Sequence, residues 1–395
     1  MIKKGKLFVI LISIVFVLSL AANADIERKG GDYVEEITKS FDVNPGGTLD
    51  LEACHGSVHC MLSPDAKLHI YIKKSVDTSS KTNAKRLLDE YEIEIDQSGN
   101  DVKVEVDRLS RGSNNGVQLH FEVKVPKNYN VDCKTGGGSI KAEGLIGNLD
   151  ANTGGGSVKV SRTEGNIGIN TGGGSVKVSD VKKGKVKVNT GGGSVSVRDV
   201  ANTVKVNTGG GSIDVSGIGG KAVVSTGGGT IDIGASEGSV HASTGGGSID
   251  IDGSKGEVFA STGGGSVRVD GSNGPVKVST GGGSIDVENA RESIIASTGG
   301  GSIKAKYLGA KDGKGEVSLS TGGGDVTLYI PEDLGATFDV ELKLRDPGEE
   351  YKIESDFPLK IDKDDDKITA TGVINKGGNR IKIRTTNSDI KIKKL

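Results

Sequence analysis

The sequence has few of the residues that build a globular core. Its 395 residues include no tryptophan, seven tyrosines and seven phenylalanines. This shortage leaves little material for a conventional core or for an aromatic platform that binds carbohydrate. The formal net charge of -2 gives no general attraction to nucleic acid or acidic membranes, so we expect no nucleic acid partner.

Long apolar runs are also absent after the first 24 residues, so no transmembrane segment is expected in the mature chain. Residues 1–24 are typical of a secretory signal peptide. Three lysines precede the apolar stretch 7–20, and small residues follow at 22–24 where a signal peptidase cuts. We therefore expect an exported protein, located in the periplasm, on the cell surface or outside the cell.

Glycine, in contrast, is abundant, with 64 residues, and much of it occurs in the block Thr-Gly-Gly-Gly-Ser. Eleven copies occur, most of them 18 residues apart, and Thr230 and Asp325 replace the serine in two of them. The copies begin at Thr135, Thr153, Thr171, Thr190, Thr208, Thr226, Thr244, Thr262, Thr280, Thr298 and Thr321. So much glycine often indicates disorder, but its strict register with alternating valine and isoleucine predicts a repeat fold.

The repeat unit can be analysed by counting from its threonine. Positions -4, -2, +5 and +7 are apolar in nearly every copy, which predicts two short strands per coil with these side chains inward. The glycines form the corner between the strands, where glycine can take positive φ and stack closely on the coil below. The threonine points inward, and its hydroxyl is expected to satisfy an amide exposed by the corner. The pattern predicts an all-β protein, a right-handed β-helix of about eleven 18-residue coils.

Strand-like segments flank the repeats, and we interpret them as caps that cover the open ends of the solenoid. One short helix is predicted over residues 79–91, where Ala84, Leu87, Leu88 and Tyr91 follow helical spacing. The predicted division is a signal peptide at 1–24, an N-terminal β-rich cap at 25–134, the repeat solenoid at 135–330 and a C-terminal β cap at 331–395.

These features together resemble the bacterial putative adhesin domain family, a domain of unknown function, and are similar to the head domains of putative auto-transporter adhesins. The resemblance rests on the signal peptide, the N-terminal strands with one helix, the Gly-Ser-Ile or Gly-Ser-Val repeats and the ending at 380–392. It covers nearly all of the mature chain, and its motif is structural. It implies a secreted or envelope-associated β-helix with an adhesin-like role, and it supplies no catalytic residue. The strict Thr-Gly-Gly-Gly-Ser block is more regular than the family requires.

The outward +6 position varies between basic and acidic residues, which makes it the candidate ligand-binding position. Residues 153–206 carry nine basic and three acidic side chains, whereas residues 207–261 carry two and six. A solvated face, a patch for lateral association and a calcium site are alternative interpretations. Lysine occupies the aspartate position of a calcium-binding repeat in three copies, so we predict no metal and no cofactor. The candidate residues are Lys141, Lys159, Lys177, Asp214, Asp232, Asp250 and Asp286.

The densest set of metal-ligand residue types is Cys54-His55-Gly56-Ser57-Val58-His59-Cys60. Aligning Gly56-Ser57 with the repeat corner makes this segment a degenerate coil with Val58 and Cys60 inward and His59 outward. Cys133 also falls at an inward position. A disulfide from Cys133 to Cys60 or Cys54, free buried thiols and a metal site all remain open.

We therefore predict a non-enzymatic adhesion or scaffold module. Its partner would be a surface ligand, such as a polysaccharide, an envelope component or a protein, with lateral or end-to-end self-association as a further interaction. One alternative is a β-helical carbohydrate-active enzyme, although no paired carboxylates, Ser-His-Asp set or nucleotide loop stands out. The other alternative is a self-assembling structural rod.

Overall fold

The computed structural model describes residues 26–109, 116–310, 313–345 and 350–395. The chain divides into two compact units, residues 1–155 and residues 156–395. The predicted signal peptide at 1–24 lies outside the described residues. None of the helices in the described ranges is long and apolar enough to cross a membrane.

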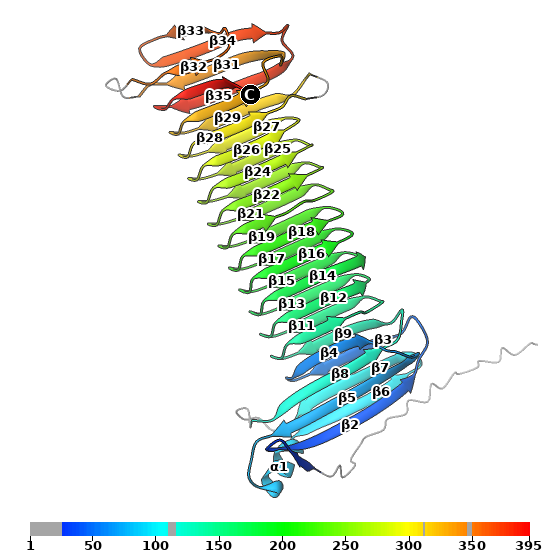
Figure 1. Cartoon of the computed structure of the whole chain (residues 1–395). Coiled ribbons are helices and arrows are strands. Elements are labelled where there is room, and N and C mark those ends of the chain that lie inside the picture. Colours follow the sequence, from blue (N-terminus) through cyan, green and yellow to red (C-terminus); the bar gives the residue numbers. More distant parts are fainter. Residues whose placement is uncertain (1–25, 110–115, 311–312, 346–349) are drawn as a thin grey trace, which may run out of the picture. The chain divides into compact units, whose positions relative to one another are not determined.

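The first unit is built from two sheets and one helix (Figure 1). One sheet has the strand order β1-β2-β5-β8-β4-β10, and the other has the order β6-β7-β3-β9-β11. The outer strands of each sheet pair antiparallel, and the strands after them pair parallel, as in a solenoid coil. The elements are β1 (Glu27–Lys29), β2 (Asp32–Asp42), β3 (Thr48–Ala53), β4 (Ser57–Leu62), β5 (Lys67–Val76), α1 (Lys81–Leu88), β6 (Tyr91–Ser98), β7 (Asp101–Arg108), β8 (Gln118–Val125), β9 (Asn130–Thr135), β10 (Ile140–Glu143) and β11 (Leu149–Thr153).

Helix α1 is shorter than the predicted range 79–91. It begins after Ser80, whose hydroxyl accepts a hydrogen bond from the backbone N–H of Asn83 at 3.3 Å. Its C-terminal end is held by the buried Lys74, whose Nζ donates to the carbonyl oxygens of Leu88 at 3.2 Å and Tyr91 at 3.1 Å. Because Tyr91 already begins strand β6, the fourth residue of the apolar pattern belongs to the strand and not to the helix.

The second unit is a stack of coils, each with two strands that pair in parallel with those of the next coil (Figure 1). The strands of one face are β12 (Val158–Glu164), β14 (Val176–Lys183), β16 (Val195–Val200), β18 (Ile213–Ile218), β20 (Ile231–Ile233), β22 (Ile249–Ser254), β24 (Val267–Ser272), β26 (Ile285–Ala290), β28 (Ile303–Tyr307) and β30 (Val326–Ile330). Those of the other face are β13 (Ile167–Thr171), β15 (Val186–Thr190), β17 (Val204–Thr208), β19 (Ala222–Thr226), β21 (Val240–Thr244), β23 (Val258–Thr262), β25 (Val276–Thr280), β27 (Ile294–Thr298) and β29 (Glu316–Thr321).

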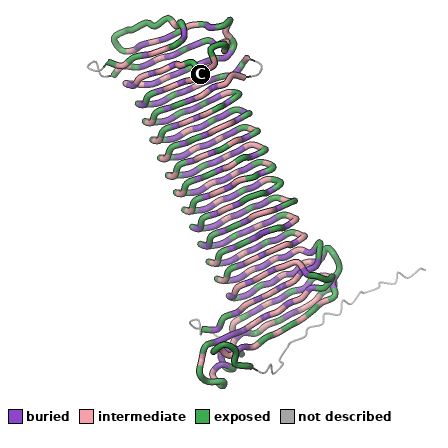
Figure 2. Tube along the Cα trace, in the orientation of Figure 1, coloured by how far each residue is buried: buried purple, intermediate pink, exposed green. Residues whose placement is uncertain are grey.

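The core of the second unit lies between its two faces and follows the alternation predicted from the sequence. Val195 and Val197 are buried on strand β16, whereas Ser196 between them is not. The same alternation of buried and more exposed residues repeats along the stack (Figure 2). The all-β solenoid with one short helix is therefore confirmed.

The threonine of each repeat is buried and links two coils. Thr208 Oγ1 donates to the carbonyl oxygen of Gly193, 2.9 Å away in the preceding coil, and accepts from the N–H of Gly211 at 3.3 Å. The predicted role of the hydroxyl in satisfying a corner amide is thus confirmed, and it also satisfies a carbonyl group.

The role predicted for the corner glycines was only half right, because they stack closely but do not take positive φ. Glycines with positive φ in the second unit occur at the opposite turn, for example Gly253 (φ 79) and Gly271 (φ 69). At the corner, a Cβ added to Gly211 would overlap the carbonyl oxygen of Gly193, whereas one added to Gly210 would meet nothing within 4 Å. Close approach of two backbones, and not backbone conformation, is therefore what requires glycine at the third position of the corner.

The C-terminal segment adds one more coil and then covers it. β35 (Asn379–Thr386) and β36 (Ile390–Lys394) pair in parallel with β29 and β30, and Thr385 Oγ1 donates to the carbonyl oxygen of Gly324 at 2.9 Å, as the repeat threonines do. The strands that precede this coil in sequence lie beyond it in space. They are β31 (Ala336–Lys343), β32 (Ile353–Ser355), β33 (Lys360–Lys363) and β34 (Lys367–Ile374).

Candidate functional site

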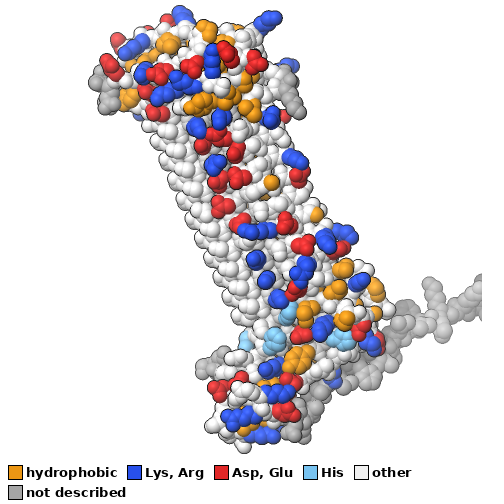
Figure 3. Space-filling view, in the orientation of Figure 1, with side chains coloured by type: hydrophobic (Ala, Val, Ile, Leu, Met, Phe, Trp, Pro, Cys, Tyr) orange, Lys and Arg blue, Asp and Glu red, His pale blue; other side chains and the backbone are white. Residues whose placement is uncertain are grey.

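On the second unit, parallel pairing joins the +6 residue of each coil to the +6 residue of the next, which aligns nine side chains in one column. We call this column the charge ladder, and Figure 3 shows basic and acidic side chains following one another along the coils beside an uncharged surface. Its members are Lys159, Lys177, Ser196, Asp214, Asp232, Asp250, Arg268, Asp286 and Lys304. Of the candidates predicted from the sequence, all but Lys141 lie in it. Lys141 belongs to strand β10 of the first unit, where its Nζ lies 2.9 Å from Glu143 Oε2.

The basic end of the ladder has two exposed lysines. Lys159 and Lys177 are exposed neighbours on β12 and β14, and neither forms an ion pair with any described residue. Asp214 differs, because its Oδ2 lies 2.5 Å from Arg198 Nη2. Two adjacent cations without a partner of opposite charge are suited to bind an anionic group.

A shallow groove of about 390 Å³ runs beside this part of the ladder. Its floor is formed by buried apolar residues such as Val176 and Val195, and its walls are the ladder and a row of exposed serines. The serines are Ser157, Ser175, Ser194 and Ser212, one from each successive coil. The groove therefore offers hydroxyl groups and charges to a ligand that lies along the stack.

The acidic part of the ladder is crowded. Partial burial raises the pKa of Asp232, and the charges of Asp250 and Asp214 raise it further. Partial burial and the charge of Asp252 raise the pKa of Asp250 in the same way. The described residues contain no group of three or more His, Cys, Asp or Glu side chains arranged to hold a metal ion. A cationic partner would nevertheless relieve the repulsion among these carboxylates.

The structure brings two of the three cysteines together. Cys60 on β4 and Cys133 on β9 are fully buried, with their Sγ atoms 3.4 Å apart and both thiols free. Cys54 is exposed, and its Sγ lies 3.5 Å from Nδ1 of His55. Cys60 and Cys133 are therefore the pair whose geometry suits a bridge.

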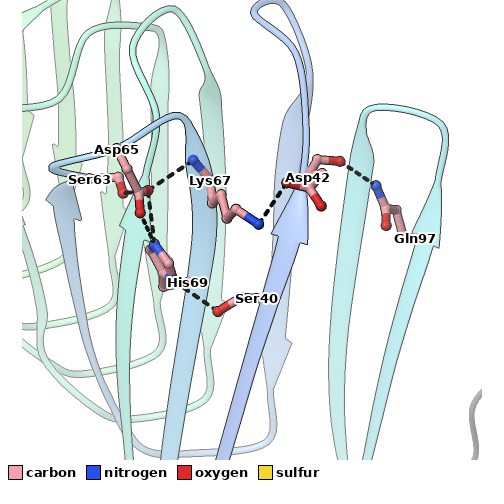
Figure 4. Close-up of polar contacts among 7 residues, drawn as sticks. All are labelled: Ser40, Asp42, Ser63, Asp65, Lys67, His69 and Gln97. Carbon is pink, nitrogen blue, oxygen red and sulfur yellow. Dashed lines mark hydrogen bonds and ion pairs between the residues drawn. The ribbon is translucent and has the colours of Figure 1, made fainter.

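Sequence reasoning missed a polar cluster in the first unit that contains serine, histidine and aspartate. Ser40 Oγ lies 2.8 Å from His69 Nδ1, and His69 Nε2 lies 2.9 Å from Asp65 Oδ1 (Figure 4). Asp65 also accepts hydrogen bonds from Ser63 Oγ and from the backbone N–H of Lys67, each at 2.9 Å. Only the antiparallel pairing of β2 with β5 places Ser40 opposite His69, 29 residues away, so no local signal could have found it.

We interpret this cluster as a structural latch. In a hydrolytic triad the acid is buried and orients the histidine, whereas the Asp65 side chain is 52% exposed. Its hydrogen bonds fix the turn between β4 and β5, and His69 connects that turn to strand β2.

The latch predicts an acid-sensitive contribution to stability. The hydrogen bond from the Lys67 N–H, with those from His69 and Ser63, lowers the pKa of Asp65 from 3.8 to about 2. Because the folded-state pKa is lowered, ionised Asp65 stabilises the fold above about pH 4, and this contribution is lost as the pH falls toward 2. Thermal unfolding between pH 5 and pH 2 should therefore show a steeper fall in melting temperature for the wild type than for Asp65→Asn. Equal slopes for these two proteins, with Asp333→Asn as an exposed control, would contradict the latch.

Several solved structures resemble the chain only weakly. A putative cell adhesion protein from Clostridium sporogenes is 10% identical, with 92% of this chain and 100% of that chain covered and a TM-score of 0.19. A putative adhesin from Bacteroides fragilis is 12% identical, with 91% and 97% covered and a TM-score of 0.20. A putative adhesin from Parabacteroides distasonis is 13% identical, with 75% and 93% covered and a TM-score of 0.25. Identities and TM-scores this low assign no role to this chain, and no curated protein matches the sequence.

The family model for Toastrack DUF4097 gives a firmer result. It matches residues 57–263, which is slightly more than half of the 395 residues. The matched range includes coils of both units and most of the charge ladder. The resemblance drawn from the repeat pattern is therefore confirmed, and the chain belongs to the Toastrack DUF4097 family.

Proposed function

We propose that the protein is an exported, adhesin-like β-solenoid that acts as a binding or scaffold module of the cell envelope or surface, without catalysis. The charge ladder is its binding surface. Export is supported by the pattern of residues 1–24, with three lysines, an apolar stretch and small residues at 22–24. The adhesin-like role is supported by the family resemblance.

One observation carries the assignment of the surface. Most inward positions of the coils hold apolar side chains or hydrogen-bonded threonines and serines, so their chemistry serves the fold. The ladder instead exposes two adjacent lysines without an ion-pair partner among the described residues, beside a groove lined with serine hydroxyls. The groove distinguishes these lysines from ordinary exposed charges, because it places the two cations and the serine hydroxyls where one ligand can contact them together.

A binding assay with a matched control tests this proposal. The double variant Lys159→Glu/Lys177→Glu is expected to bind isolated envelope material of the source bacterium about tenfold more weakly than the wild type, a change of about 1.4 kcal/mol. Lys187→Glu/Lys205→Glu makes the same change in charge on two exposed neighbours, on strands β15 and β17 of the other face. Sedimentation of labelled protein with the envelope fraction measures both.

The result also separates the alternatives. Equal loss of binding in the two double variants would show that the ladder is not the site, because only net charge would then matter. Cleavage of acidic polysaccharides by the wild type would support the carbohydrate-active alternative and overturn the non-catalytic proposal. Recovery of the protein in the cytoplasmic fraction of its host would overturn export.

A further inference from the structure

The basic and acidic parts of the charge ladder are arranged symmetrically about one residue. Ser196 lies at the centre, with Lys177 and Lys159 on one side and Asp214 and Asp232 on the other. These five residues occupy consecutive strands of one face in unbroken parallel register, so each is one coil from the next. Two positive charges, a neutral residue and two negative charges thus follow one another in a column.

Such a column is complementary to itself when reversed. Suppose that two copies face each other across a two-fold axis that lies in the interface between them, parallel to strand β16 and above Ser196. Lys177 of one copy then meets Asp214 of the other. Lys159 meets Asp232 in the same way, and the symmetry forms every pair twice. Two copies side by side in the same direction would instead bring like charges together, so the pattern favours the antiparallel arrangement.

We propose that residues 159–232 of the charge ladder bind a second copy of this chain in antiparallel orientation. This assignment of the partner rests on the proposed function, in which the ladder is the binding surface. It accounts for both the basic and the acidic residues of this segment, since an anionic ligand would engage only the lysines.

Local contacts are consistent with this partner. Lys159 and Lys177 are exposed and make no ion pair with the described residues, so both can reach across. Asp232 is also exposed and forms no salt bridge with any residue that the structure describes. A lysine from the second copy would offset the repulsion from its acidic neighbours. Near the axis, Arg198 of one copy would face Arg198 of the other copy. Each Arg198, however, forms an ion pair with Asp214 of its own chain at 2.5 Å. Asp214 would then contact both Arg198 of its own chain and Lys177 of the second copy.

Exposed ion pairs are individually weak and are screened by salt, so the dimer should be salt-sensitive. Sedimentation equilibrium of the mature chain is expected to give about twice the monomer mass near 0.01 M salt, where charges act over about 30 Å, and the monomer mass near 1 M salt. Monomers at both salt concentrations, up to millimolar protein, would overturn the proposal.

Charge-swap variants make the test specific. Lys159→Asp/Lys177→Asp makes the four positions acidic, and Asp214→Lys/Asp232→Lys makes them basic, so each variant alone is expected to be monomeric. Mixing the two should restore a dimer that contains one copy of each. Lys187→Asp/Lys205→Asp, on the opposite face, should dimerise like the wild type. A mixture that stays monomeric, or a control that also dissociates, would overturn the proposal.

Measuring dimer formation and envelope binding with the same proteins distinguishes a failure of this inference from a failure of the proposed function. If the wild type is monomeric but Lys159→Asp/Lys177→Asp still loses binding to envelope material, the second copy is the wrong partner and the binding surface stands. If the wild type dimerises through the swap-sensitive ladder and envelope binding is unchanged in the variants, the second copy stands as the partner and envelope binding occurs elsewhere.

Discussion

Replacing Gly211 with alanine is expected to lower the free energy of unfolding by about 3 kcal/mol, whereas the same change at Gly210 should alter it by less than about 1 kcal/mol. A Cβ at Gly211 would overlap the carbonyl oxygen of Gly193 and lie 2.6 Å from the backbone N of Ser194. Neither group can move without separating two coils, because both belong to the backbone of the preceding coil. A Cβ at Gly210 would meet nothing within 4 Å.

Chemical denaturation followed by far-ultraviolet circular dichroism measures both variants against the wild type. The two glycines are adjacent and neither has positive φ, so the comparison isolates the contact between coils from the loss of backbone freedom. Equal stability of the two variants would show that the corner relaxes around a methyl group, and that close stacking is not the reason for glycine at that position.

The fold could be predicted from the sequence because every coil of a solenoid has the same pattern of inward and outward positions. One coil determines the next, so the apolar positions around a single threonine, such as Val206 and Ile213 around Thr208, specify the inward face of every coil. The φ angles of the corner could not be predicted in this way. Glycine is compatible with both positive φ and close backbone approach, and only the position of the preceding coil shows which of them applies.

Features that depend on long-range pairing were beyond the sequence pattern. Nothing local indicates that β35 and β36, at the end of the chain, stack on β29 and β30 while the segments before them lie beyond. The contact of Ser40 with His69 likewise requires knowledge of which strands pair. These features come from the caps, where no repeat supplies the register.

The candidate binding surface was partly predictable for the same reason that the fold was. Period-two alternation places residue +6 outward, so Lys159 and Asp232 could be assigned to one column from the sequence. The ion pair of Asp214 with Arg198 could not be assigned, because it joins the +6 position of one coil to the +8 position of its neighbour. Side-chain reach, and not register, decides which charges remain available for a partner.

The sequence left open whether Cys133 would pair with Cys60 or with Cys54, and the positions of strands β4 and β9 favour Cys60. Cys60 and Cys133 face each other from the two sheets of the first unit, with Sγ atoms 3.4 Å apart in a fully buried position. The hydrogen bond with Cys60, together with burial, raises the pKa of the Cys133 thiol well above its ordinary value. Few thiolates are then present once the core has closed, so we propose that the bridge forms during folding, before burial.

In an oxidising compartment outside the cytosol, Cys60 and Cys133 are therefore expected to form a disulfide. The two thiols lose their protons and two electrons to a thiol–disulfide exchange partner, whose own disulfide is reduced. Closing a loop between residues 73 apart should stabilise the unit by about 4 kcal/mol over its reduced form. Denaturation with and without reductant measures this difference, which Cys54→Ser should retain and Cys60→Ala/Cys133→Ala should abolish. If all three thiols of the exported protein react with a thiol reagent after denaturation without reductant, the pair is a buried dithiol and its role is packing alone.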